Sequence, residues 1–331
     1  MDANNNSTQY LFIGHIVTSV LNSVSSLTAV AGNAVVILVV WKTPALHTPS
    51  NVFLCCLAVS DLTVGLIAQP SFVIHKIGEL LQNNSMYCTT RILTESVGYI
   101  TAGTSVVTMT GIAIERYLAL YLHLRYKQII TTNRILVAAF CLSVFFICLT
   151  ASRFWIANDH IFNNISIPVI GCSLVFAFLA YMKVLKYVRR HENQIHDQNA
   201  SNPDRYPASN RLLGIRRHKK STLTMVYIVG IFVLCYIPIL CVKLAHTIEG
   251  YTSSVKTANL YATTIVFLNS SFNPVVYCWR ITDIRRAVKS IFWHCLWGKA
   301  LPDIETPQAS IRLSNFNTTG ASRSVIQPGL N

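Results

Sequence analysis

Charged side chains are scarce in this chain. They make up 12% of its 331 residues, about half the share typical of a soluble domain, while hydrophobic residues make up 52%. Acidic residues are scarcer still, with 13 Asp and Glu against 27 Lys and Arg. The basic residues lie in the gaps between apolar runs, so membrane topology explains them better than nucleic-acid binding does. The composition indicates a multi-pass membrane protein with no nucleic-acid partner.

Several functional signals are also absent. The N-terminus has no basic segment followed by a signal-cleavage site, so we expect no cleaved signal peptide. There is no repeat of fixed period, which argues against a transporter. The chain lacks a phosphate-binding glycine loop, and His15, His75, His123, His160 and His246 have no metal-ligand spacing to one another, so we expect no enzyme. The alternative is a transporter or ion channel that uses the mid-membrane acid Asp61.

Seven apolar runs are long enough to cross a bilayer. They cover about 13–41, 52–74, 86–121, 135–152, 165–188, 223–244 and 258–279. We expect loops between them at 76–85, 153–164 and, flexible in its middle, 193–210. Lys and Arg favour the loops after the first, third and fifth runs, which predicts an N-terminus outside and a cytoplasmic C-terminus. The outer sequons at Asn5, Asn6 and Asn83 are glycosylation candidates. The predicted fold is all-α, a seven-transmembrane helix bundle in the plasma membrane.

The flanking segments differ from the bundle. Residues 1–12 form an extracellular tail too short for a ligand-binding domain, so the ligand must enter the bundle or its loops. Residues 281–295 separate apolar from basic side chains, which predicts a short amphipathic helix in contact with lipids of the inner leaflet. Cys295 is an acylation candidate, with an unmodified cysteine as the alternative. We therefore assign 13–295 to the seven-transmembrane domain and 296–331 to a disordered cytoplasmic tail.

Two polar sites interrupt the apolar runs. Asp61 lies in mid-span, where an ionisable group costs about 2.5–3.5 kcal/mol to insert. It is either a helix-packing group or an ion or proton site, and the second interpretation is the default for an intramembrane acid. The triplet Glu115-Arg116-Tyr117 ends the third run at a basic loop. Its carboxylate and guanidinium are costly there unless they pair, and a plain solvated helix end is the alternative.

Five motifs follow one another along these runs: Gly32-Asn33, Leu57–Leu62, Glu115-Arg116-Tyr117, Cys235–Pro238 and Asn273–Tyr277. With them, residues 13–295 resemble a rhodopsin-like (class A) G-protein-coupled receptor. The resemblance implies an extracellular small-molecule, lipid or peptide ligand, a heterotrimeric G protein admitted by outward movement of the sixth helix, and arrestin as a further partner. It implies a G-protein switch made of Glu115, Arg116, Tyr117, Tyr181, Asn273, Pro274 and Tyr277. It also implies no cofactor except an allosteric sodium ion, held by Asp61, Ser105, Asn269 and Asn273.

The chain departs from this family pattern at several positions. Tyr236 stands where the family usually has Trp, and the fourth run lacks the family's Trp. The basic stretch 216–220 replaces the usual acidic partner of Arg116, from which we hypothesise basal activity. The loop at 153–164 has no cysteine to pair with Cys88, so we expect the usual disulfide to be absent. With this short, cysteine-free loop the chain resembles the melanocortin, cannabinoid and lysolipid receptor group, with adenosine receptors in the same cluster.

The resemblance also narrows the ligand. Gly98 stands where aminergic receptors carry Asp, and Phe267 where opsins carry the retinal-binding Lys, so we expect neither a typical biogenic amine nor retinal. The other candidates for the ligand pocket lie near the outer ends of the runs: Arg91, Glu95, Tyr99, Tyr236, Lys243 and His246. For Lys243 we favour extension to the lipid headgroups. If it faces inward instead, with Arg91, it favours a ligand bearing a carboxylate or phosphate.

Overall fold

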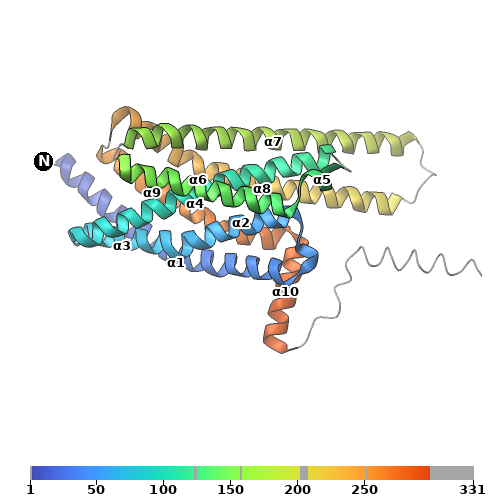
Figure 1. The fold of residues 1–331 in the computed structure, drawn as a ribbon, viewed down its shortest axis with the longest axis horizontal. Helices are drawn as coiled ribbons and strands as arrows, with labels where there is room; N and C mark the ends of the chain where they lie inside the picture. The colour runs from blue at the N-terminus through green and yellow to red at the C-terminus, as the bar shows by residue number, and fades with distance from the viewer. Residues whose placement is uncertain (1, 123–124, 157–158, 202–207, 251, 299–331) are drawn as a thin grey trace, which may run out of the picture. The chain divides into compact units, whose positions relative to one another are not determined.

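The computed structural model describes residues 2–122, 125–156, 159–201, 208–250 and 252–298, and the described chain is helical without a β-strand. Its helices are α1 (Asp2–Lys42), η1 (Pro44–Leu46), α2 (Pro49–Thr63), η2 (Val64–Ala68), α3 (Gln69–Leu80), α4 (Asn84–Leu122), α5 (Tyr126–Ile129), α6 (Thr132–Ile156), α7 (Asp159–Ser201), α8 (Ala208–Glu249), α9 (Ser253–Arg280) and α10 (Thr282–Trp297). Contacts divide the chain into two units, Met1–Arg285 and Arg286–Asn331. In the first unit the helices from α1 to α9 pack side by side as a bundle (Figure 1).

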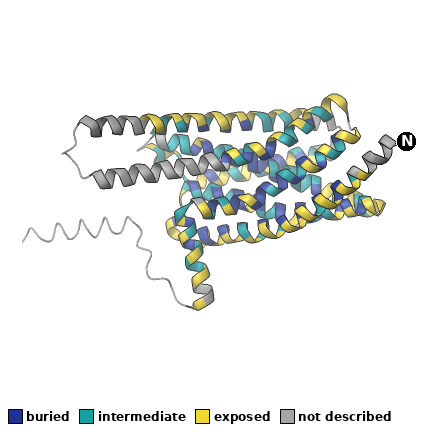
Figure 2. Ribbon diagram, turned by 180° about the vertical axis from the view of Figure 1, so that it is seen from behind, coloured by how far each residue is buried: buried dark blue, intermediate teal, exposed yellow. Residues whose placement is uncertain are grey.

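Burial in the bundle is the reverse of that in a soluble protein. Large apolar side chains such as Leu27, Phe140 and Leu234 are about 70% exposed, and the residues coloured as exposed lie along the outer helix faces of the ribbon in Figure 2. Polar side chains such as Asn33 and Gln69 are fully buried. An apolar outer face over a polar interior suits a hydrocarbon solvent, where backbone and polar groups must be satisfied inside the protein. Among the described helices, six are long and apolar enough to cross a membrane.

The seventh predicted span corresponds to α9, which is less apolar because its inward face is polar. Asn33 on α1 donates its amide to the Ser270 carbonyl at 3.0 Å, and the Ser271 hydroxyl donates to the Ser25 carbonyl at 2.8 Å. Both bonds fasten α9 to α1 through groups that lipid could not satisfy. The predicted spans therefore correspond, in chain order, to α1, α2 with η2 and α3, α4, α6, α7, α8 and α9.

The second span contains one turn of π-helix. In η2 the Gln69 amide donates to the Val64 carbonyl, five residues back. The wide turn precedes Pro70, which lacks the N–H that would bond to the carbonyl four residues earlier. A side chain from α1 replaces part of the lost bonding, because the Ser26 hydroxyl donates to the Gly65 carbonyl at 2.7 Å. The span therefore crosses the bundle as α2, η2 and α3 without leaving this carbonyl unpaired.

Three predicted loops are wrong in their extent. Helix α3 continues to Leu80, α6 to Ile156 and α7 to Ser201, so most of 76–85 and 153–164 and the first half of 193–210 are helical. At 76–85 two charged side chains pair along one helix, with Lys76 Nζ 3.1 Å from Glu79 Oε2. Pairing at this spacing stabilises a helix instead of ending it. Only a short turn remains before Asn83, whose side chain caps α4 by accepting the Met86 amide at 3.1 Å.

Helices form at both ends of the described chain, where the sequence predicted a tail at 1–12 and an amphipathic helix at 281–295. Helix α1 begins at Asp2, so the predicted tail at 1–12 is largely a continuation of the first helix, although the side chains of Asn5 and Asn6 lie outside the described residues. The predicted amphipathic helix at 281–295 forms as α10, and its location on the inner leaflet stays a prediction. The side chain of Cys295 and all of 299–331 lie outside the described residues.

Gly32 permits the close approach of α1 to α9, and its replacement is a test of the bundle. A Cβ at Gly32 would lie 2.8 Å from Pro274 Cβ and 2.9 Å from its Cγ. The proline ring is fixed to the backbone and cannot rotate away. We therefore expect Gly32→Ala to lower the free energy of unfolding by about 1–3 kcal/mol through overpacking. Thermal unfolding of the purified protein in detergent measures this loss.

Gly230 in α8 provides the matched control. No described heavy atom lies within 4 Å of the position that its Cβ would take. Gly230→Ala should therefore raise stability by about 1 kcal/mol, because Ala is the better helix former and meets nothing. Equal losses in the two variants would contradict the packing of α1 on α9 described above.

Candidate functional site

Three helices meet around the mid-membrane acid. Asp61 on α2 is 1% exposed, and Asn273 on α9 donates its side-chain amide to Asp61 Oδ2 at 2.7 Å. The neighbouring Ser60 hydroxyl lies 3.1 Å from the hydroxyl of Ser105 on α4. The structure therefore brings Asn273 directly to Asp61, and it brings Ser105 to the residue beside it.

Asn269 supplies the test of whether this site fits a cation. It lies one helical turn before Asn273 on α9 and is 2% exposed, and its Oδ1 has no hydrogen-bond partner among the described residues. A buried acceptor without a partner costs about 1–3 kcal/mol. A carboxylate, an amide oxygen and a hydroxyl are ligands of the kind that a hard cation prefers. The residues predicted for the sodium site, Asp61, Ser105, Asn269 and Asn273, therefore fit such an ion chemically.

The carboxylate of Glu115 is buried and held by neighbouring elements. Its Oε1 accepts hydrogen bonds from Ser50 on α2, at 2.8 Å, and from the hydroxyl of Tyr126 on α5. Burial and the bond to Glu115 raise the pKa of Tyr126, so its hydroxyl stays a donor at neutral pH. Arg116 Nε lies 3.4 Å from Glu115 Oε2, which is an ion-pair distance without hydrogen-bond geometry. A plain solvated helix end is therefore wrong for Glu115, which is 2% exposed.

Three tyrosines, Tyr117, Tyr181 and Tyr277, are among the remaining switch candidates. Tyr181 on α7 and Tyr277 on α9 are 4% and 0% exposed, and neither hydroxyl has a hydrogen-bond partner within the part of the chain that the structure describes. Tyr117 stacks on Tyr121, with ring centroids 5.8 Å apart, below the ammonium of Lys183. The water-mediated meeting of Tyr181 and Tyr277 in an active state stays a prediction.

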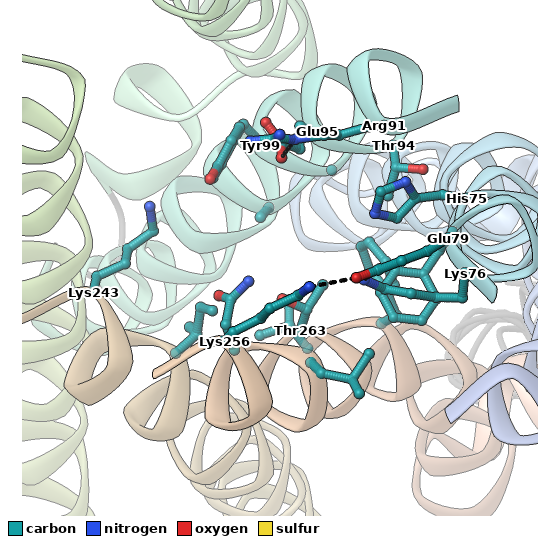
Figure 3. Close-up of a pocket in the computed structure, with 18 of the residues that line it drawn as sticks. His75, Lys76, Glu79, Arg91, Thr94, Glu95, Tyr99, Lys243, Lys256 and Thr263 are labelled. Atoms are coloured by element: carbon teal, nitrogen blue, oxygen red, sulfur yellow. Dashed lines mark hydrogen bonds and ion pairs between the residues drawn. The ribbon is translucent and has the colours of Figure 1, made fainter. Parts of the chain in front are cut away.

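A cavity of about 140 Å³ opens among α1, α3, α4, α8 and α9 (Figure 3). Seven of the predicted pocket residues line it: Arg91, Glu95, Gly98, Tyr99, Tyr236, Lys243 and Phe267. The eighth, His246, is not among the described lining residues, and its Nδ1 lies 3.3 Å from Asn163 Nδ2. The resemblance therefore located the cavity, although the use of these residues by a ligand stays a prediction.

Lys243 faces the cavity, so its predicted extension to the headgroups is wrong. The residue is 7% exposed, and its ammonium lies 4.6 Å from the centroid of the Tyr99 ring and 3.4 Å from Asn163 Oδ1. A cation over an aromatic face gains about 0.5–2 kcal/mol, which helps to hold the side chain inward. Nearby on α4, Arg91 Nε pairs with Glu95 Oε1 at 2.9 Å.

Sequence reasoning missed a charged cluster on another side of the cavity. Glu79 on α3 pairs with Lys76 on the same helix and accepts a hydrogen bond from Lys256 on α9. His15 Nε2 on α1 lies 3.8 Å from Glu79 Oε2, and His75 also lines the cavity. Lys76 and Glu79 fell in a predicted loop, and their spacing of three residues was the one signal for a shared helix face.

The middle of the cavity is apolar and aromatic. Phe72 and Phe267 meet edge to face, with ring centroids 5.9 Å apart. Tyr236 stacks on Phe232 at 4.3 Å, and its hydroxyl donates to the Ala102 carbonyl at 3.4 Å. Apolar walls with a few placed polar groups are typical of small-molecule sites. The cavity thus combines aromatic walls with two groups of charged side chains.

A cavity within the bundle, a mid-span acid and a separate buried Glu115 at ion-pair distance from Arg116 together define a heptahelical membrane receptor. The family described as 7 transmembrane receptor (rhodopsin family) matches residues 32–277, and the chain belongs to this family. It is a multi-pass membrane receptor and not an enzyme.

Individual relatives share about a quarter of their residues with the chain. The Adenosine receptor A2b of Rattus norvegicus is 27% identical over 301 residues, covering 78% of this chain and 84% of that protein. The QRFP-like peptide receptor of Branchiostoma floridae is 27% identical, covering 88% and 81%. The Histamine H2 receptor of Cavia porcellus is 23% identical, covering 91% and 84%. Their names point to different ligands, so similarity alone does not assign one to this chain.

Proposed function

We propose that this chain is a plasma-membrane receptor that activates a heterotrimeric G protein when an anionic ligand binds the cavity. The charge of the cavity carries this proposal, because its described lining contains four basic side chains and two acidic ones. These are Lys76, Arg91, Lys243 and Lys256 against Glu79 and Glu95. An excess of positive charge in an enclosed, partly apolar site favours a carboxylate or phosphate group on the ligand.

The mechanism is a change of conformation. A ligand on Lys243 and Tyr236 contacts α8 close to Pro238, which interrupts the hydrogen-bond ladder of that helix. Outward movement of α8 opens the cytoplasmic side near Arg116 to the G protein, and arrestin is the second proposed partner of this cleft. The ligand shifts this balance only by its difference in affinity for the two states. The basic segment 211–220, whose side chains lie outside the described residues, would lie against anionic lipid.

A sodium ion is the proposed regulator of the resting state. Asp61, Ser105, Asn269 and Asn273 would hold it, and the ion would supply the positive charge that a buried carboxylate requires. The unpartnered oxygen of Asn269 supports this assignment. The N-terminus is proposed to lie outside the cell and the C-terminus in the cytoplasm, in line with the distribution of Lys and Arg.

The proposal is tested by G-protein activation in cells that express the chain. The cells are challenged with carboxylates, phosphates, peptides, nucleosides and amines, and we expect a response to an anionic class. Lys243→Gln should raise the half-maximal agonist concentration at least about tenfold, because a charge-assisted hydrogen bond contributes about 1.5–3 kcal/mol. Lys42→Gln, the same change at an exposed lysine outside the cavity, should leave it unchanged. Activation by amines or neutral nucleosides alone would refute the anionic ligand.

A further inference from the structure

Two lysines from different helices converge on one carboxylate in the wall of the cavity. Lys76 Nζ lies 3.1 Å from Glu79 Oε2, and Lys256 donates to Glu79 Oε1. One negative charge therefore faces two positive charges in a partly enclosed site. Charge retained inside a membrane bundle is costly, and such groups mark functional sites by default.

The two lysines that contact Glu79 differ in the helix that carries them and in the exposure of their side chains. Lys76 is the intrahelical partner, three residues away on α3, and its side chain is 11% exposed. Lys256 reaches Glu79 from α9, across a separation of 177 residues, and its side chain is 32% exposed. Figure 3 shows Lys256 extending along the cavity toward Glu79. If Lys256 released Glu79, the carboxylate would keep Lys76 as its partner.

This cluster and Lys243 lie on different sides of the cavity (Figure 3). Lys76 and Glu79 belong to α3, which packs against α1 and α4, whereas Lys243 belongs to α8, which packs against α7 and α9. The edge-to-face pair of Phe72 and Phe267 lines the same cavity, and the Lys76 ammonium lies 5.6 Å from the centroid of the Phe72 ring. The cavity thus offers two cationic positions on different sides, together with an aromatic surface in its lining.

We propose, building on the anionic ligand assigned above, that Lys256 is a second anion-binding position and that the ligand carries two anionic groups joined by an apolar segment. One carboxylate or phosphate binds Lys243, and the other binds Lys256 in place of Glu79. The apolar segment packs against Phe72 and Phe267. Exchanging one anion for another leaves Lys256 paired, so its charge stays compensated.

The test measures thermal stabilisation of the purified full-length receptor in phosphatidylcholine nanodiscs. The probes are α,ω-dicarboxylates from butanedioate to dodecanedioate, each beside the monocarboxylate and the diol of equal length. We expect one diacid length to bind at least about tenfold more tightly than its monoacid, and the diols to give no shift. The corresponding diphosphonates form a second arm, which distinguishes phosphate from carboxylate recognition.

Two variants distinguish a ligand-binding role of Lys256 from a purely structural contact between α3 and α9. Lys256→Gln should reduce the affinity for the diacid to that for the monoacid. Glu79→Gln should increase it several-fold, because the internal competitor for Lys256 is removed. If Lys76, Glu79 and Lys256 served only to hold α3 against α9, both variants would lower thermal stability. The ratio of diacid to monoacid affinity would then stay unchanged. The control Lys42→Gln should change none of these values.

The outcomes distinguish this inference from the function on which it rests. If the wild-type protein binds diacids no better than monoacids, the anion-binding position at Lys256 is overturned. The proposal of a single ligand anion at Lys243 is then unaffected. An unchanged affinity ratio in both Glu79→Gln and Lys256→Gln would overturn it as well. Absence of binding by every acid and diphosphonate would overturn both proposals.

Discussion

Arg116→Ala is expected to abolish ligand-dependent G-protein activation while leaving ligand binding unchanged. Arg116 does not line the cavity, and its side chain is 29% exposed, so the substitution removes no ligand contact. Its guanidinium carries donors in a fixed fork that a G protein can engage. Agonist-stimulated nucleotide exchange on a purified G protein, with the receptor in nanodiscs, measures the loss. If Arg116→Ala still stimulated nucleotide exchange at equal receptor concentration, the proposed role of Arg116 in the switch would be wrong.

Arg134→Ala is the matched control for this experiment. Its guanidinium is exposed and donates to the carbonyls of Gln128 and Ile129, at 3.3 and 2.7 Å, beside the α5 segment. We expect this variant to keep most of its activation, because the bonds it loses are exposed and local. A comparable loss in both variants would indicate a general effect of positive charge instead of a specific role of Arg116.

The contacts of Glu115 explain why Arg116 can be released. Ser50 and Tyr126 both donate to Glu115 Oε1, so the carboxylate keeps two hydrogen bonds when Arg116 moves away. A buried carboxylate stripped of every partner would be strongly destabilising, whereas one that keeps two donors is not. The weak geometry between Arg116 and Glu115, at 3.4 Å, therefore suits a pair that separates on activation.

Replacing sodium with N-methyl-D-glucamine at constant ionic strength is expected to raise agonist affinity about tenfold in the wild-type protein. The proposed ion stabilises the resting state, and coupling between two sites is typically 1–3 kcal/mol. Asp61→Asn should abolish the sodium response, because the substitution removes the only formal charge among the four proposed ligands. Agonist competition binding measures both effects.

Asp283→Asn is the control for the sodium experiment. It is the same change of acid to amide, at an exposed residue in the first turn of α10. This variant should keep the wild-type response to sodium. A persistent sodium effect in Asp61→Asn would place the ion elsewhere or show that the response is one of general ionic composition.

The polar positions inside the bundle were largely predictable from the sequence. Asp61, Glu115 and Asn273 stand out because an apolar run tolerates polar side chains only where other helices satisfy them. The structure supplies those partners, in Asn273 for Asp61 and in Ser50 for Glu115. The resemblance grouped Asp61 with Asn273 in one site, whereas the pairing of Glu115 with Ser50, which lies 65 residues away, was not visible in the sequence.

The errors have a common physical cause. Lys76 and Glu79 fell in a predicted loop, yet they belong to helix α3, where Glu79 pairs with Lys76 and with Lys256 from α9. Lys243 was expected to extend to the headgroups, and Tyr99 and Asn163 hold it inward instead. In each case a contact from another helix reversed a local preference, which reasoning along a single segment cannot reveal.

The π-turn η2 determines which residues of the second span reach the ligand. An added residue in a helix rotates every later side chain by about 100° around the axis. Phe72, Lys76 and Glu79 all follow this turn and line the cavity. Deleting one residue between Val64 and Ala68 would therefore turn a different set of side chains toward the cavity. A one-residue change in helix register would thus alter the cavity lining without any substitution in the lining itself.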